Sequence, residues 1–310
     1  MVDISAKERL CYQYFIENKI QNRQHLRSVL KNNPLPEVTQ SFAESMFSAF
    51  KNEMKAQSNT NIHDTVGQTE PYKVICINDL HIPFHDEKAV KLVFKFIKQQ
   101  QPNELILNGD ILDCYQQSKF TKDPAHKLYL QDEADMFYSI FSDLRKWIPN
   151  TKISYVLGNH ERRIETVTWA TPAFYSVEAL QIPKLLRCDE LNIDVYAKAR
   201  FINKFKFYHG VATNQHAGAS AKKELEIHCY NPGMTGHTHR LGDYSRTGDF
   251  KSYRWDENGC LCDLHPKYID TVANWQHGFS LILFTDTTHY VSRIEIKDYE
   301  FSFGGQIHRL

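Results

Sequence analysis

The hydrophobic positions in the first sixty residues have helical spacing. Val29 and Leu30 follow Leu26 by three and four residues, and the pattern stops at Asn32-Asn33-Pro34. A second helix is predicted to begin near Pro36 and to run through Phe42, Met46, Phe47 and Phe50. We therefore expect a small helical segment at the start of the chain.

The pattern of hydrophobic residues changes after a polar stretch from Gln57 to Thr69. This stretch has no periodic apolar residues, which is typical of a linker. From Pro71 onward, short apolar runs alternate with amphipathic patterns. We predict a helical segment with its linker over residues 1–68 and a separate domain over residues 69–310.

Strand and helix patterns alternate through this second part. The run Val74-Ile75-Cys76-Ile77 is typical of a strand that is buried on both faces. Asp86 is expected to cap a helix that extends to about Gln100. The other predicted elements are strands at 105–107, 153–157 and 205–208, a helix around 127–148 and a closing hairpin at 280–284 and 290–296. This alternation predicts the α/β class.

Residues 240–278 look irregular, with scattered Gly, Asp and aromatic side chains. We predict that they form a long loop or lid. Tyr244, Tyr253 and Trp255 in this segment would either stack on nucleic-acid bases or fasten the loop to the core.

Five short clusters of metal-binding side chains come where strands are expected to end. Four of them follow predicted strands, whose carboxyl ends meet at one edge of an α/β sheet. The fifth follows a turn and what reads as a very short strand. In chain order the clusters are Asp79-Leu80-His81, Gly109 to Asp113, Gly158 to Glu161, His209-Gly210 and Gly236 to His239. Their side chains are expected to converge on one site.

The clusters supply enough ligands for two adjacent divalent cations, the usual arrangement for in-line attack on phosphorus. Asp79 and His81 are two residues apart, so they point to one side of an extended segment. Asp110 is placed to bridge the two ions. The predicted ligands are Asp79, His81, Asp110, Asn159, His209, His237 and His239. This mixture of donors favours Mn²⁺ or Fe, with Zn²⁺ as a further option.

His160 stands beside the predicted ligand Asn159, where it can face a bound substrate. We assign it as the general acid that protonates the leaving oxygen, with Asp113 orienting its imidazole. A hydroxide that bridges the two metals would be the nucleophile, because metal-bound water is far more acidic than free water. The predicted substrate contacts are Arg162, Arg163 and His216.

The amino-acid composition limits which partners and which cellular location we expect for the protein. Lys plus Arg and Asp plus Glu both number 37, and this balance argues against a general polyanion binder. No apolar stretch approaches the length of a membrane span, and the 7 scattered cysteines predict a reducing, cytoplasmic location. Cys260 and Cys262, with His265 nearby, hint at zinc, although their spacing differs from that of usual zinc sites.

The clusters resemble the motifs D-x-H, G-D-x-x-D, G-N-H-E/D, H and G-H-x-H of the calcineurin-like metallophosphoesterase superfamily. This resemblance implies a four-layered α/β/β/α sandwich. It also implies one ion held by Asp79, His81, Asp110 and His239. The second ion would be held by Asp110, Asn159, His209 and His237. His160 and Asp113 would again form the catalytic pair.

One position departs from part of that superfamily. Its protein Ser/Thr phosphatases place an Arg directly after the second Asp of G-D-x-x-D, where this chain has Cys114. A dedicated phosphoprotein phosphatase is therefore disfavoured. The sequence looks more like the bacterial and phage-encoded members.

Three functions are compatible with these features. The leading hypothesis is a phosphodiesterase or nuclease that acts on nucleic acid or nucleotides, because basic and aromatic residues accompany the predicted metal site. The alternatives are a phosphomonoesterase for a small metabolite or a phosphorylated nucleic-acid end, and a non-catalytic metal-stabilised binding protein. Residues 1–60 are expected to support packing or homo-oligomerisation, or to read DNA as a helix-turn-helix.

Overall fold

The computed structural model describes residues 70–248, 251–266 and 272–310. In the N-terminal part it describes residues 11, 14, 15, 18, 20, 22–35, 38–44, 46 and 47. The predicted linker at 57–69 lies outside the described residues. Within the described ranges, no helix combines the length and the apolar character needed to cross a bilayer.

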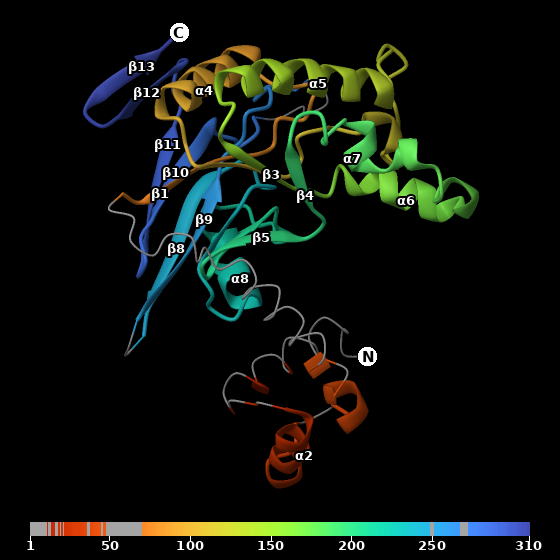
Figure 1. Ribbon diagram of the computed structural model, residues 1–310, viewed down its shortest axis with the longest axis vertical. Helices are drawn as coiled ribbons and strands as arrows, with labels where there is room; N and C mark the ends of the chain where they lie inside the picture. Colours follow the sequence, from red (N-terminus) through yellow and green to blue (C-terminus); the bar gives the residue numbers. More distant parts are fainter. Residues whose placement is uncertain are drawn as a thin grey trace.

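A six-stranded sheet forms the centre of the larger part of the protein (Figure 1). Its strands are β1 (Tyr72–Ile77), β2 (Glu104–Asn108), β3 (Lys152–Val156), β4 (Ile193–Tyr196), β10 (Gly278–Phe284) and β11 (His289–Glu295). Their order in space is β11-β10-β1-β2-β3-β4, with β1 to β4 parallel and β10 and β11 antiparallel to their neighbours. The predicted strands of this region and the closing hairpin are confirmed.

β1 is buried on both faces because its side chains alternate between two cores. Ile75 and Ile77 pack with the helices that cover this sheet. Val74 and Cys76 pack with residues of a second sheet. All four side chains are fully buried. The uninterrupted apolar run therefore belongs to a strand in an inner layer of the fold.

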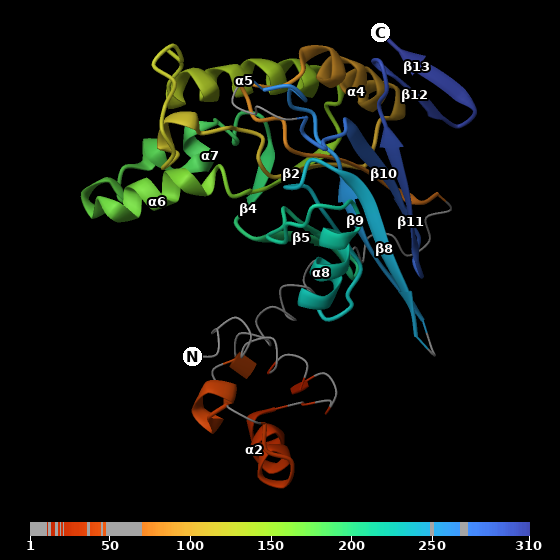
Figure 2. The same cartoon turned by 180° about the vertical axis from the view of Figure 1, so that it is seen from behind.

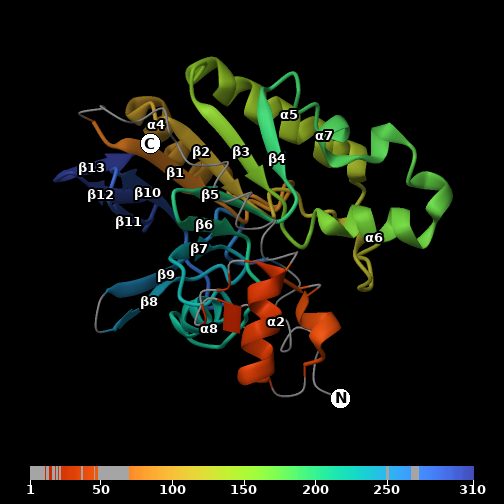
Figure 3. The ribbon, with the colours of Figure 1, turned by 60° about the horizontal axis from the view of Figure 1, so that its bottom comes forward.

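The second sheet packs against the first and has five strands (Figure 3). They are β5 (Ala199–Ile202), β6 (Phe205–Tyr208), β7 (Gly233–Thr235), β8 (Leu241–Thr247) and β9 (Ser252–Asn258). Their order is β5-β6-β7-β9-β8. The strand predicted at 205–208 and the very short strand before the fifth cluster are confirmed.

The prediction of an irregular loop or lid over residues 240–278 is wrong for its first half, where β8 and β9 form an antiparallel hairpin. β9 does not look like a strand because two of its buried positions carry charge. Asp256 is fully buried and pairs with Arg254 and Arg293. The fully buried Glu257 accepts hydrogen bonds from surrounding groups. Pairing makes this burial of charge possible.

Trp255 lies at the centre of this hairpin's contact with the rest of the sheet. Its side chain is fully buried among Ala221 and Leu225, and its ring stacks on His228. Of the two alternatives for the aromatic residues of this segment, fastening to the core is therefore confirmed for Trp255.

Helices cover the outer faces of both sheets (Figures 1 and 2). α4 (Glu87–Gln100) and α5 (Leu130–Trp147) pack on the first sheet, and α8 (Ala219–Ile227) packs on the second. Asp86 caps α4 as predicted, because its carboxylate accepts the Ala89 N–H at 2.9 Å. The predicted four-layered α/β/β/α arrangement is confirmed.

Shorter elements complete the described fold. They are α6 (Arg162–Ala170), α7 (Ile182–Leu185), β12 (Glu300–Phe303), β13 (Gln306–Arg309) and the 3-10 turns η2 (Tyr115–Gln117), η3 (Pro172–Phe174) and η4 (Glu178–Leu180). α6 begins directly after the third cluster, and η2 begins two residues after Asp113, the last residue of the second cluster.

A buried ion pair links the two sheets. Arg200 of β5 donates hydrogen bonds to both carboxylate oxygens of Glu104 in β2, at 2.8 and 3.0 Å. The hydroxyl groups of Ser154 and Tyr72 donate to the same carboxylate at 2.6 and 3.1 Å. Full pairing of this kind is what allows two charges to remain in a protein interior. The pair fixes β5 against β2.

The first predicted helix of the N-terminal segment is confirmed. The second is described only in part, as helical residues at 40–44, 46 and 47, while Pro36 and Phe50 lie outside the described residues. α2 (Arg23–Asn32) begins after Asn22, whose side chain accepts the His25 N–H at 2.8 Å, and it ends at the predicted break. Phe15 and Phe47 belong to an apolar cluster made by this segment alone. Its roles in oligomerisation or DNA reading stay predictions.

Candidate metal centre and active site

Hydrogen bonds join the loops that follow β1, β2 and β3. The Asp79 N–H donates to the carbonyl oxygen of Gly109 at 3.0 Å. The His81 N–H donates to the carbonyl oxygen of Asp110 at 3.0 Å. The His160 N–H donates to the Asp110 carboxylate at 2.9 Å. Three of the five clusters are thus fixed to one another at the carboxyl ends of parallel strands.

The predicted His and Asp ligands form two neighbouring groups. They are Asp79, His81 and His239 in one group, and Asp110, His209 and His237 in the other. Within each group the ligand atoms lie within 4.8 Å of one another. His239 Nε2 lies 3.1 Å from Asp79 Oδ1 and 3.1 Å from His81 Nε2. His209 Nε2 lies 3.0 Å from Asp110 Oδ2 and 4.0 Å from Asp79 Oδ1, so the groups adjoin.

Two buried ligand atoms accept or donate no hydrogen bond within the described chain. They are Asp79 Oδ1 and His209 Nε2. An unsatisfied buried polar atom costs about 1–3 kcal/mol, and such atoms are rare in folded proteins. Each of the two faces another ligand atom at short range, which is the arrangement of donors that share a cation. The residues present therefore fit a pair of divalent ions.

Partners on the second ring nitrogen orient two of these imidazoles. His209 Nδ1 lies 2.9 Å from the backbone oxygen of Asn108. His81 Nδ1 lies 3.0 Å from Asp113 Oδ1. In both rings Nε2 is left facing the ligand groups, and such partners fix the tautomer of metal-binding histidines.

Five predicted ligands have a left-handed backbone conformation. The φ angle is positive, between 48° and 68°, at Asp79, His81, Asp110, His237 and His239. Each non-glycine residue in this region costs on the order of 1–3 kcal/mol. Strain is concentrated where side chains must converge, which is typical of functional sites.

The carboxylates change the protonation of the buried imidazoles. Burial opposes charge on His209, but the Asp110 and Asp79 carboxylates outweigh it and raise its pKa to about 9. Burial also opposes ionisation of Asp79, whereas the nearby His239 and His209 hold its pKa well below the usual range. The site therefore binds protons that a divalent cation would displace.

His160 is held between Asp113 and the ligand groups. Its Nδ1 lies 2.8 Å from the Asp113 backbone oxygen and 3.2 Å from Asp113 Oδ1. Its Nε2 lies 3.7 Å from Asp110 Oδ2. Arg163 donates to the Asp113 backbone oxygen at 2.8 Å, and its Nη2 lies 2.7 Å from His160 Nε2. The structure thus brings the predicted catalytic pair together with one predicted substrate contact.

Three further predicted residues lie around this centre. Asn159 is exposed in the turn before His160. The Arg162 guanidinium donates to the backbone oxygen of Ala197. His216 is exposed in the loop between β6 and α8. Their roles as a metal ligand and as substrate contacts stay predictions.

Glu161 has a positioning role that the sequence analysis missed. Its carboxylate is fully buried and binds the second and third clusters together. The donors are the N–H groups of Asp110 (3.1 Å), Leu112 (2.9 Å) and Gly158 (2.8 Å) and the hydroxyl of Tyr155 (2.7 Å). Its position directly after His160 was the available signal, because it stands inside a cluster without being needed as a ligand.

Cys262 reaches the centre from the segment that follows β9. Its Sγ lies 3.8 Å from His239 Nδ1, and Cys260 belongs to the same group of possible ligands. Among the described residues, the histidine grouped with the two cysteines is His239 and not His265, so the predicted grouping with His265 is wrong. Cys262 instead contacts Nδ1 of His239, whereas the other ring nitrogen, Nε2, faces Asp79.

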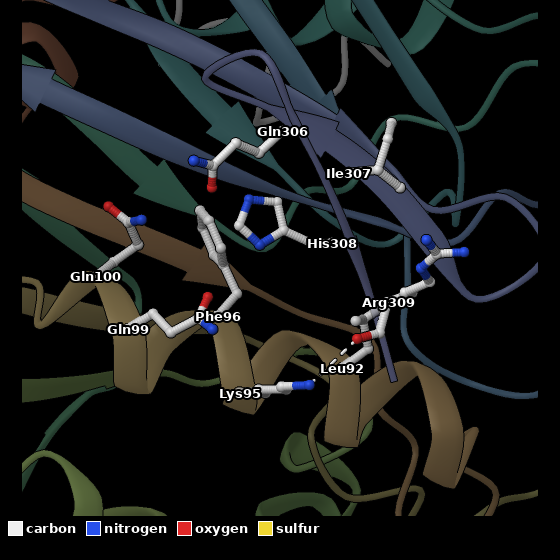
Figure 4. Close-up of a pocket in the computed structure, with 9 residues that line it drawn as sticks. All are labelled: Leu92, Lys95, Phe96, Gln99, Gln100, Gln306, Ile307, His308 and Arg309. Carbon is white, nitrogen blue, oxygen red and sulfur yellow. Dashed lines mark hydrogen bonds between the residues drawn. The ribbon is translucent and has the colours of Figure 1, made fainter.

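A cavity of about 450 Å³ lies elsewhere, between α4 and β13 (Figure 4). Phe96 and His308 face each other in it, and Lys95 Nζ donates to the Arg309 backbone oxygen at 3.3 Å. Among the described residues that line this cavity, none is a predicted ligand. The predicted ligands therefore lie outside this cavity.

Comparison with known proteins places the chain in a family. The family model for calcineurin-like phosphoesterases matches residues 72–276. The Gene 54 protein of Mycobacterium phage L5 is 27% identical over 229 residues, which cover 68% of this chain and 88% of the relative. The Gene 54 protein of Mycobacterium phage D29 is 25% identical over 225 residues, with the same coverage of 68% and 88%.

Solved structures of low sequence identity are also similar. Yfce, a phosphoesterase from E. coli, is 15% identical with a TM-score of 0.34, covering 73% of this chain and 100% of that chain. A dimetal phosphatase from Danio rerio is 10% identical with a TM-score of 0.39, covering 72% and 96%.

The chain belongs to the calcineurin-like phosphoesterase family, since the family model spans most of its length. The predicted family is confirmed. It is a hydrolase that acts on phosphoric ester bonds, and its family implies bound divalent metal ions.

Proposed function

We propose that the protein is a phosphodiesterase that cleaves nucleic acid or nucleotides. The observation that carries this proposal is the position of His160, held by Asp113 and directed at the edge of two ligand groups. Hydrolysis of a phosphodiester expels one of its alcohol groups as an alkoxide. An alkoxide is a poor leaving group unless an acid protonates it. General acid catalysis of this kind contributes about 10²–10⁴-fold.

His160 would deliver that proton from Nε2. Its Nδ1 is engaged by Asp113, which orients the ring. Two divalent cations would supply Lewis acidity, both to activate water and to offset the charge of the phosphate. The two ligand groups would hold them, with Asp110 closest to both His160 and His209.

We propose Mn²⁺ as the native metal, with Fe and Zn²⁺ as the other options. Carboxylate and imidazole donors predominate in the two groups, and this mixture suits Mn²⁺ or Fe. Cys262 faces Nδ1 of His239, the ring nitrogen that points away from Asp79, so it lies outside the two ligand groups.

The phosphate surroundings also support a polymeric or diester substrate. Arg163 stands beside His160 and offers a guanidinium for a phosphate oxygen. β8 and β9 belong to the second sheet, so this part of the chain does not form the enclosing lid that a small monoester would favour.

Hydrolysis of two model esters tests this proposal. Turnover of bis-p-nitrophenyl phosphate and p-nitrophenyl phosphate is measured with Mn²⁺ for the wild type, His160→Ala and the control His265→Ala. Preference for the diester in the wild type and in His265→Ala supports the phosphodiesterase. Because p-nitrophenolate leaves without an acid, the role of His160 is measured on a dinucleotide, whose alkoxide leaving group needs a proton. His160→Ala should lose far more activity on the dinucleotide than on bis-p-nitrophenyl phosphate. Preference for the monoester would establish the phosphomonoesterase instead. No turnover of either ester by metal-loaded protein would favour a non-catalytic binding protein.

A further inference from the structure

Large exposed apolar side chains gather on two segments that start at the candidate active site. Seven of the fourteen in the described chain lie there, at Phe120, Tyr129, Val167, Trp169, Phe174, Tyr175 and Val177. One segment, residues 115–129, follows the predicted catalytic Asp113. The other, residues 162–177, follows His160 and Glu161. We call the two segments together the rim.

The two segments of the rim lie side by side. Arg163, in the first turn of α6, donates to the Asp113 backbone oxygen at 2.8 Å, and η2 packs against α6. Figures 1 and 2 show both segments at the α6 end of the protein. The rim is therefore one surface that leads into the active site.

The side chains of the rim are strongly exposed. Phe120 is 69% exposed, Trp169 is 62% exposed and Tyr175 is 65% exposed. All residues from 171 to 179 are exposed. Exposure of this many large apolar side chains on two neighbouring segments favours a ligand or partner there.

Cations are interleaved with these aromatic rings. Residues 115–129 contain Lys119, Lys122 and Lys127 against one acidic residue, Asp123. Lys122 Nζ lies 5.4 Å from the centre of the Tyr115 ring and donates to backbone oxygens of its own loop. These contacts hold the Lys122 ammonium group within the 115–129 segment of the rim.

Charged groups of the candidate active site also affect the pKa of Lys122. Burial and the positive charge of Arg163 lower its pKa, while Asp113 acts in the opposite direction. Lys122 is held over Tyr115 of η2, which packs against α6, and Arg163 of α6 contacts His160, so both cations belong to the rim beside the predicted general acid. Regularly spaced anions, such as the phosphates of a polynucleotide, would form ion pairs with Lys122 and Arg163.

We propose that the rim binds single-stranded polynucleotide, with phosphates against Lys122 and Arg163 and unpaired bases stacked on Phe120 and Trp169. This inference rests on the proposed function. Flat apolar rings alternating with cations are the features that bind single strands without sequence preference. Lysines are depleted in the cores of protein–protein interfaces, so a second copy of the chain fits this surface less well.

Binding of a labelled phosphorothioate oligothymidylate of about 15 nucleotides to the Mn²⁺-loaded protein tests the proposal, since single-strand sites span roughly 4–16 nucleotides. Fluorescence anisotropy gives Kd for the wild type, Phe120→Ala and Trp169→Ala. Each aromatic variant should bind about 5- to 150-fold more weakly. Lys122→Ala should reduce the slope of log affinity against log salt by about 0.7.

Tyr290→Ala is the matched control. Tyr290 is 62% exposed on β11 and is in register with Leu283, which pairs with Lys73 at the end of β1 opposite to the site. Its replacement should leave the oligonucleotide Kd unchanged. Equal Kd values for all variants would overturn the proposal. So would a Trp169→Ala protein that binds DNA normally but loses a concentration-dependent dimer in sedimentation.

The small diester separates this inference from the proposed function. If bis-p-nitrophenyl phosphate is not hydrolysed by the wild type, the phosphodiesterase itself fails. If it is hydrolysed and the rim variants cleave an unmodified oligonucleotide as well as the wild type does, only the rim proposal fails. A fall in the ratio of oligonucleotide to small-diester turnover in Phe120→Ala and Trp169→Ala supports it.

Discussion

His209 Nδ1 lies 2.9 Å from the backbone oxygen of Asn108, the last residue of β2. An imidazole that follows a strand of the second sheet is thereby held by the first sheet. Asn108 also donates its side-chain amide to the backbone oxygen of Tyr208 at 3.0 Å. The predicted metal centre therefore lies across the junction of the two sheets, and its geometry depends on their contact.

Gly109 lies in close contact with His209 at this junction, and we predict that Gly109→Ala disrupts the contact. A Cβ there would lie 2.3 Å from His209 Nδ1, on a backbone with φ of +86°. The variant should lose bound metal and most diester turnover, which metal analysis and the ester assay measure. Gly304→Ala is the control, because φ is +60° there and no atom lies within 4 Å. Equal metal content in the two variants would contradict the prediction.

Glu161 should be needed for stability as well as for the position of Asp110. Glu161→Gln keeps the size of the side chain but replaces an acceptor oxygen with a donor facing N–H groups. We expect unfolding free energy to fall by about 2–5 kcal/mol, measured by urea denaturation. Glu178→Gln, at an exposed position in η4, should change it by less than about 0.5 kcal/mol. Similar losses in both variants would refute the assigned role.

The sequence was informative where local patterns coincide with burial. Asp86 and the helical spacing after it identify α4, and the run from Val74 to Ile77 identifies β1. The ligand clusters were recognisable because each lies within a few residues at a strand end. β9 could not be recognised, because Asp256 and Glu257 acquire their partners only in the folded protein.

Interactions that orient the ligands were also beyond the sequence. A backbone oxygen such as that of Asn108 carries no residue-specific signal, although it sets the tautomer of His209. Cys262 contacts His239 across 23 positions of the chain. Such contacts depend on how the two sheets meet, and no local spacing encodes that.

Removing one partner of the buried Glu104–Arg200 pair should destabilise the protein strongly, because the other charge is then left without a partner in the interior. Arg200→Gln is expected to lower the unfolding free energy by about 3–5 kcal/mol. Lys146→Gln removes an exposed pair with Asp143 and should cost less than about 1 kcal/mol. Thermal or urea unfolding of the two variants compares them directly. A small effect of Arg200→Gln would mean that water solvates Glu104 after the change.

The metal-free protein should lose stability as pH rises from 6.5 to above 9. The pKa of His209 is about 9 in the folded chain and 6.5 for an unperturbed imidazole, so its protonation stabilises the fold fully below pH 6.5. That contribution disappears as pH rises through 9. Urea unfolding in EDTA at several pH values measures it, and His209→Asn should flatten the profile. A wild-type profile as flat as that of the variant would contradict the assignment.

Metal removal gives a related prediction for the same groups. Cations would satisfy Asp79 Oδ1 and His209 Nε2, the two buried atoms that lack hydrogen bonds. Addition of Mn²⁺ to the EDTA-treated protein should therefore raise the melting temperature and release protons at pH 7. Calorimetry in buffers of different ionisation enthalpy measures this release. Binding without proton release would show that the imidazoles were already neutral.

The core between the two sheets has a consequence for catalysis that reaches beyond the ligands. Phe207 and Val156 pack in this core, one from each sheet. A change in the thickness of this layer would shift His209 and His237 relative to Asp79 and Asp110. The spacing of the two cations, and with it the choice of metal, is therefore open to adjustment by residues that no substrate ever meets.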